Sequence, residues 1–182
     1  MSLIPFGFWA ASGGVAGAYD LLETTTLATA ASSVTFSSID QSYSHLQVRW
    51  VAKNTGSATS NIGLTINGVT SNYFTHRLYG DGSSVTSAAS TSAPNNNIVN
   101  GSSLSTTANA FGAGVLDILS YSNTTTNKTL RMLYGSKDTN QTIALQSGSV
   151  ASTAAVTNFE FSVSAGLFAV GTRFSIYGIK GA

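Results

Sequence analysis

Apolar and polar residues alternate along much of this chain, and a period of two is the pattern of half-buried β-strands. In the clearest example, residues 46–53, the apolar positions are Leu46, Val48, Trp50 and Ala52. No stretch combines a helix cap with an apolar stripe at helical spacing, and the abundant Gly, Ser, Thr and Asn are poor helix formers. The alternation therefore predicts an all-β protein.

Turn-forming residues divide the alternating stretches into short strands. Strands are predicted at 34–39, 46–53, 62–66, 73–79, 113–121, 129–134, 142–146, 156–163 and 173–179. Asn67-Gly68 and Asp81-Gly82 offer the positive φ angles that tight hairpin turns need. A total of about eight to ten short strands at this spacing predicts a jelly-roll-like antiparallel β-sandwich.

The 182 residues suffice for one buried core, so we expect a single β-sandwich domain over residues 20–182. Residues 1–19 are predicted to form an extended N-terminal anchoring arm. Its apolar side chains are the candidate partner-binding residues Leu3, Ile4, Pro5, Phe6, Phe8 and Trp9. A signal peptide is the alternative, because Ala16-Gly17-Ala18 resembles a cleavage site, but no Lys or Arg precedes the apolar run and several glycines interrupt it.

Charged residues are only 8% of the chain and the formal net charge is +1. Binding nucleic acid needs a concentrated basic surface, so nucleic acid is not expected as a partner, and no membrane association is expected either. Solubility then rests on hydroxyl and amide groups, which suits a protein that is packed into an assembly. With no Cys and only His45 and His76, neither a metal site nor a cofactor is expected.

The uncharged stretch 83–103 is predicted to be a loop, with room for a short strand near Ile98 and Val99. Loops at the ends of a sandwich often carry recognition. The candidate recognition residues are Ser83, Ser84, Pro94, Asn95, Asn96 and Asn97. A solvated connector with no binding role is the alternative.

Enzymatic chemistry finds little support in the sequence. Asp40 and His45 could join one of many serines in a hydrolase triad, but no G-x-S-x-G motif accompanies them. Glu23 and Glu160 are the only glutamates, and Glu160 lies between two phenylalanines in NFEFSV, which indicates the solvated side of a sheet. We therefore expect no catalytic residues and a protein that is not an enzyme.

Two residues within predicted strands are interpreted structurally. Trp50 is expected to be a core anchor, since an aromatic on an alternating strand is more often buried than presented to a ligand. Gly178 lies inside the last strand and predicts a bulge or a close approach of another group to the backbone.

Several blocks of the chain resemble a group of tailed-bacteriophage virion proteins. These blocks are FWAASGG with AYDLLETTTL, SVTFSSI, YSHLQVRW, VLDILSYSNTTTNKTLR and GTRFSIYGIKG. Proteins of that group have an aromatic, small-residue arm before a Ser/Thr-rich jelly roll. The resemblance implies a structural part of a phage particle, either a capsid decoration (cement) protein or a tail-fibre-like protein.

The chain has no heptads or β-helical repeats from which a fibre stalk could be built, which favours the decoration protein. The expected partners are the major capsid protein and copies of the chain itself as a homotrimer, on the capsid surface of virions assembled in the bacterial host cytoplasm. One alternative is a tail-fibre protein that binds a host receptor or glycan through Tyr73, Tyr79 or residues 83–97. Another is a hydrolase that depends on His45 or His76.

Overall fold

The computed structural model describes residues 17–56, 60–94, 104–105, 107–136 and 142–181. These residues contain eleven strands and no helix. The strands are β1 (Tyr19–Thr26), β2 (Ser33–Phe36), β3 (His45–Ala52), β4 (Ile62–Ile66), β5 (Tyr73–Gly80), β6 (Val85–Ala93), β7 (Gly112–Leu119), β8 (Lys128–Gly135), β9 (Ile143–Val150), β10 (Phe159–Val163) and β11 (Arg173–Ile179).

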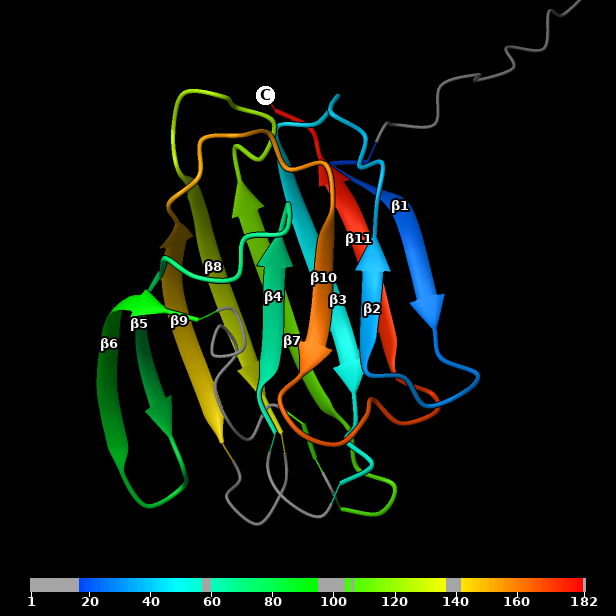
Figure 1. The fold of residues 1–182 in the computed structure, drawn as a ribbon. Helices are drawn as coiled ribbons and strands as arrows, with labels where there is room; N and C mark the ends of the chain where they lie inside the picture. The colour runs from blue at the N-terminus through cyan, green and yellow to red at the C-terminus, as the bar shows by residue number, and fades with distance from the viewer. Residues whose placement is uncertain (1–16, 57–59, 95–103, 106, 137–141, 182) are drawn as a thin grey trace, which may run out of the picture.

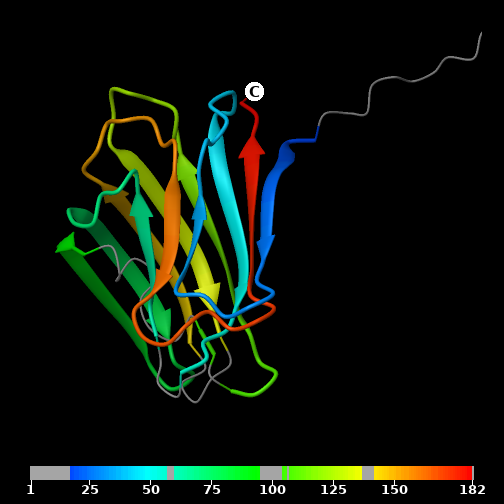
Figure 2. The same cartoon turned by 45° about the vertical axis from the view of Figure 1, so that its right-hand side comes forward.

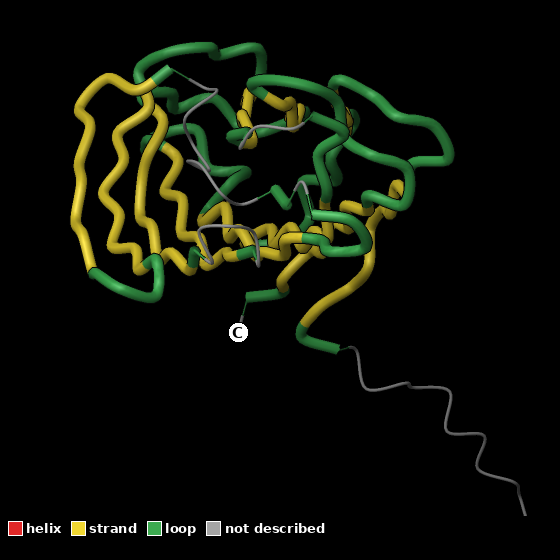
Figure 3. Tube along the Cα trace, turned by 90° about the horizontal axis from the view of Figure 1, so that it is seen from below, coloured by secondary structure: helices red, strands yellow, loops and turns green. Residues whose placement is uncertain are grey.

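The strands form two antiparallel sheets, one in front of the other (Figure 1). The large sheet has eight strands in the order β1-β11-β3-β7-β8-β9-β5-β6, and the small sheet has three in the order β2-β10-β4. The turned view in Figure 2 shows the same two layers. Seen from below, the large sheet curves strongly toward β5 and β6 (Figure 3).

The order of the strands is that of a jelly roll. The chain crosses between the sheets at each of its first four connections, from β1 to β5. Strands from its two ends then pair, so that β11 lies between β1 and β3 while β10 lies between β2 and β4. This interleaving in both sheets confirms the predicted jelly-roll-like antiparallel β-sandwich.

The core between the two sheets is aromatic at its centre. Phe161 of the small sheet packs against Trp50 and Phe174 of the large sheet, with ring centroids 6.5 and 4.7 Å apart. Phe159 continues the cluster to Phe36 at 5.5 Å. Trp50 is only 2% exposed, which confirms its predicted place in the core.

Two strand glycines make room for these rings and their neighbours. Gly114 pairs with Trp50 across β7 and β3, and a Cβ there would lie 2.1 Å from Cζ2 of Trp50. A Cβ on Gly178 would lie 2.4 Å from Cγ of Tyr43. The close approach predicted at Gly178 is therefore confirmed, and the approaching group is an aromatic ring.

Tight turns are present at both predicted positions, but only the one at Asp81-Gly82 joins two paired strands, because β4 and β5 lie in different sheets. Asn67 and Gly68 have φ angles of 49° and 77°, and Ile66 bridges Val69 across them. The turn that contains Asp81-Gly82 joins β5 to β6, with Gly82 at a φ of 90°.

The nine predicted strands correspond to β2–β5 and β7–β11, but the prediction of a loop from residue 83 onward is wrong. Residues 85–93 form β6, which pairs with β5 from Gly80 and Val85 onward. β6 is the edge strand of the large sheet. Its described side chains from 85 to 92 are exposed or half-exposed, and apart from Val85 its apolar residues are alanines, so neither face shows the row of large apolar side chains that marks a strand in sequence. β1 was also not predicted, and Tyr19, the last residue assigned to the arm, begins it.

Candidate partner-binding face

The large sheet has an outer face, turned away from the small sheet, that carries exposed aliphatic side chains. Leu133, Leu145 and Leu78 are register partners and form one row across β8, β9 and β5. Ile143 and Val85 continue this surface one row further on, where both pair with Gly80. Their exposed fractions run from 48% to 74%. We call these five residues the apolar patch; such contiguous exposed patches often mark interaction sites.

Two open depressions lie on this face, one beside Leu133 and one beside Leu78 and Leu145. The first is lined by Arg49, Phe111, Ala113, Val115, Leu133 and Ile143. The second is lined by His76, Leu78, Ser87, Arg131, Leu145 and Ser147. Both are lined mainly by outward side chains of neighbouring strands. The surface around the patch is therefore uneven and can accept protruding groups of a partner.

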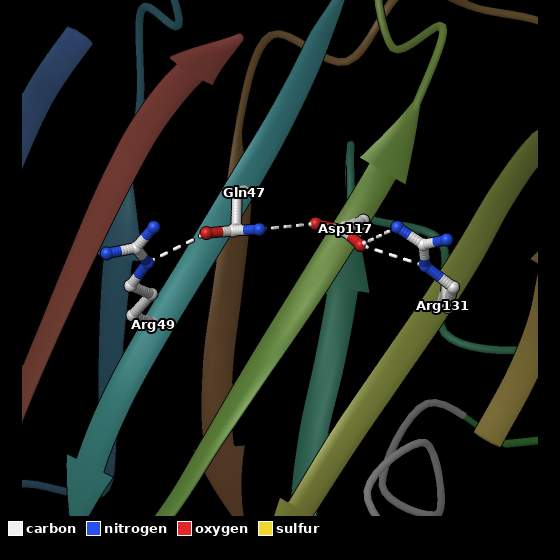
Figure 4. Close-up of polar contacts among 4 residues, drawn as sticks. All are labelled: Gln47, Arg49, Asp117 and Arg131. Carbon is white, nitrogen blue, oxygen red and sulfur yellow. Dashed lines mark hydrogen bonds and ion pairs between the residues drawn. The ribbon is translucent and has the colours of Figure 1, made fainter. Parts of the chain in front are cut away.

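A line of polar side chains borders the patch on β3, β7 and β8 (Figure 4). Gln47 donates from Nε2 to Oδ1 of Asp117 at 2.8 Å and accepts at Oε1 from Nε of Arg49 at 2.7 Å. Arg131 donates from Nε and a terminal guanidinium nitrogen to Oδ2 of Asp117, at 3.0 and 2.7 Å. Asp117 is 7% exposed and its charge is compensated by Arg131, so the carboxylate at the centre of this polar border is fully paired.

Aromatic rings extend the outer face toward β1. The guanidinium carbon of Arg49 lies 4.6 Å from the ring centroid of Tyr177 and 5.4 Å from that of Tyr19. Tyr19 and its neighbour Leu21 are both largely exposed. The outer face therefore offers aromatic and aliphatic surface from the first strand of the sheet to β6, with Arg49 in its middle.

The sequence-predicted recognition residues are only partly described. Ser83 and Ser84 lie in the β5–β6 turn, where both of their backbone N–H groups donate to Oδ1 of Asp81 at 2.9 and 2.7 Å. These hydrogen bonds hold the pKa of the Asp81 carboxyl well below its usual range. Pro94 is exposed directly after β6. The turn is thus held by its own contacts, whereas Asn95–Asn97 and the arm residues 3–9 lie outside the described residues.

Tyr73 and Tyr79, considered above for a receptor-binding loop, both lie in β5. Tyr73 is fully buried, so it is not available to a receptor. Its hydroxyl accepts from the N–H of Ile66 and donates to the carbonyl of Val69, and burial raises its pKa to about 12. Tyr79 is half-buried, with Arg77 over its ring at 5.0 Å.

The residues considered for catalysis have local structural contacts. Asp40 accepts from the N–H of Ser42, and Nδ1 of His45 accepts from the N–H of Ser120. Glu160 lies on the outward side of the small sheet and bonds Thr35, as its position between buried phenylalanines predicts, while Glu23 lies on β1 of the large sheet. Across the described ranges, no three His, Asp or Glu side chains come together as metal ligands.

Lys128 is a buried charge that the sequence did not reveal. Its Nζ donates to the carbonyls of Thr126 and Thr153 at 3.1 and 3.2 Å, and also to the carbonyl of Asn123. Burial lowers the pKa of this amine. Lys128 thereby ties the turn before β8 to the chain after β9, a role that no motif signals.

The apolar patch was also missed, although a signal for it exists. MLY in β8 and IAL in β9 are consecutive apolar residues, so each strand presents apolar side chains to both faces rather than one. Alternation indicates only the inward, core-facing side of a strand, so it does not reveal this second apolar surface.

Comparisons with protein-family models, curated proteins and solved structures found no match to this chain. The part of the chain that the structure describes has no helix long and apolar enough to cross a membrane.

Proposed function

We propose that this protein is a non-enzymatic structural component of a tailed-bacteriophage particle, a capsid decoration protein that docks on the major capsid protein and stabilises the head. The observation that carries the proposal is the apolar patch on an outer sheet face. Contiguous exposed apolar residues on a sheet face often mark a surface that a partner covers in an assembly. The resemblance of the sequence blocks to virion proteins supplies the kind of assembly.

The arm would provide the anchor. Five of its side chains, Leu3, Ile4, Phe6, Phe8 and Trp9, are large and apolar. Each could contribute about 1.5–3 kcal/mol if buried in a groove of a capsid subunit or a neighbouring copy, before the cost of ordering the segment. The sandwich would then lie over the junction of capsid subunits, where a homotrimer matches a local threefold position.

Removal of the arm tests this proposal. Deleting residues 1–14 should leave the sandwich folded by circular dichroism and abolish binding to particles that lack the protein. The point variant Phe6→Ser/Phe8→Ser/Trp9→Ser should behave like the deletion. Its matched control, Ala10→Ser/Ala11→Ser/Ala16→Ser, changes the same number of residues in the same segment without removing a large side chain. Full decoration by the deletion variant would refute anchoring by the arm.

A tail-fibre protein that binds a host glycan is the second candidate, and the exposed Tyr19 beside Arg49 and Tyr177 favours it. The ring offers an apolar face and the guanidinium offers hydrogen-bond donors, and a sugar has both apolar C–H faces and hydroxyl acceptors. Imaging a label placed after Ala182 separates the two functions. Label over the head at capsomer junctions supports the decoration protein. Label confined to the tail would replace it with the adhesin, and a glycan array with Tyr19→Ala would then identify the sugar site.

A further inference from the structure

We propose that residues 3–9 of this chain dock on the outer face of its own large sheet, across the apolar patch, as long as the protein is free of its partner. The inference deepens the proposed function, on which it rests only for the later transfer of the arm to a capsid subunit. Docking would cover two apolar surfaces at once in a chain of which only 8% of the residues are charged.

The first argument is where the segment leaves the domain. Tyr19 begins β1 at the edge of the large sheet, and its ring lies on the outer face against Arg49. Tyr19 lies in one register row with Ile179, His45 and Leu119, which crosses β1, β11, β3 and β7. We call this the Tyr19 row. The segment therefore departs beside the same face that carries the patch.

The second argument is reach. Strands lie about 4.8 Å apart, so the four steps from β1 to β8 span about 19 Å, and Leu133 lies about 13 Å further along the strands than the Tyr19 row. The diagonal is about 23 Å. The ten residues from Trp9 to Tyr19 span up to about 33 Å when extended. Trp9 can thus reach Leu133, and the residues before it can continue over β9 and β5.

The third argument is chemical complementarity. The segment 3–9 carries no charge, and the five residues of the apolar patch carry none either. Phe111 and Val115 line the depression beside Leu133, which suits an aromatic side chain. Arg49 and Arg131 stand at the border, where a guanidinium can lie over an aromatic ring. Attachment to the same chain gives the segment an effective concentration of about millimolar, so modest affinity suffices.

Fluorescence of Trp9 tests the inference on the full chain without particles. The chain has two tryptophans, and Trp50 is buried, so the difference between the wild type and Trp9→Phe isolates Trp9. If the arm docks, this difference emission is blue-shifted and poorly quenched by acrylamide. Leu133→Lys/Leu145→Lys should shift it to the red and raise the quenching constant several-fold. Leu78→Lys is a second, independent variant on the next strand.

The matched control is Ala28→Lys/Thr35→Lys, which adds the same charge at an exposed loop position and on the outward side of the small sheet, and should leave Trp9 protected. Solvent-like emission of Trp9 in the wild type would overturn the inference, as would protection that the patch variants do not change. Protection that exists only at concentrations where sedimentation detects oligomers would also overturn it and assign the arm to a neighbouring copy.

These outcomes are independent of the proposed function. A protected Trp9 in a protein that fails to bind particles keeps the docking and removes the decoration role. A solvent-exposed Trp9 in a protein that decorates particles does the reverse.

Discussion

At the scale of single residues, the core of this sandwich depends on one pairing of a large residue with glycine. Trp50 fills the space above Gly114 on β7, the neighbouring strand of the same sheet. An added Cβ on Gly114 would lie 2.1 Å from the indole. Its Nε1 is buried with no hydrogen-bond partner, so packing rather than polar contact holds the ring in place.

We predict that Trp50→Ala lowers the free energy of unfolding by about 3–5 kcal/mol, as large aromatic truncations in cores do. Gly114→Ala should cost about 1–3 kcal/mol through overpacking. In the Trp50→Ala background the same glycine substitution should cost much less, because the clashing ring is gone. Urea denaturation of the four proteins measures this cycle. Additive costs, or a loss under about 1 kcal/mol for Trp50→Ala, would contradict the packing described above.

Tyr73 makes stability depend on pH in the alkaline range. Its pKa is raised from 10.0 to about 12 in the folded protein, mainly because burial disfavours the phenolate. A raised pKa means that the stabilisation is fully present below pH 10 and is lost as the pH rises toward 12. Relative to Tyr73→Phe, the wild type should therefore lose up to about 3 kcal/mol over this interval. The measurement is urea unfolding of both proteins at several pH values; a constant difference between them would show that Tyr73 ionises normally.

At the scale of elements, the polar line across β3, β7 and β8 links three strands on a face that the core does not touch (Figure 4). Asp117 is its centre because it accepts from both Gln47 and Arg131. Gln47 is nearly buried, whereas the Arg131 side chain is 65% exposed. Water can therefore replace Asp117 as a partner of Arg131 more readily than as a partner of Gln47.

Asp117→Ala should cost about 1–3 kcal/mol, since it leaves the buried amide of Gln47 without its acceptor. Arg131→Met should cost less than Asp117→Ala, because the Arg131 side chain is 65% exposed, so that water can approach the charge left on Asp117, and the carboxylate keeps its bond from Gln47. Chemical denaturation of both variants at one salt concentration compares them. Equal costs would mean that the ion pair, and not the buried hydrogen bond, links these strands.

At the scale of the whole molecule, the two sheets share one core. The contacts of Phe161 with Trp50 and Phe174 join the small sheet to the large one at its centre. Among the described residues, neither sheet has another layer against which to bury this surface, so neither is expected to persist without the other.

We therefore predict a single cooperative unfolding transition. In a Trp9→Phe variant, the only tryptophan is Trp50, which reports the core between the sheets, while far-ultraviolet circular dichroism reports all strands. The two signals should change at the same urea concentration. A core signal that disappears first would indicate that the small sheet detaches while the large sheet remains.

The sequence by itself determined the features that depend on local periodicity and turn chemistry. Alternation located nine strands and placed Trp50 inside, and Asn67-Gly68 and Asp81-Gly82 marked turns, because these signals lie within a few neighbouring residues. Only the tertiary structure decided where β6 lies and which exposed residues meet. Val85 is the only large apolar residue of β6, so alternation does not mark the strand, and its backbone pairing with β5 is what makes it one. Leu78, Leu133 and Leu145 are far apart in the sequence and form one surface only because the strand order and register of the large sheet bring them side by side.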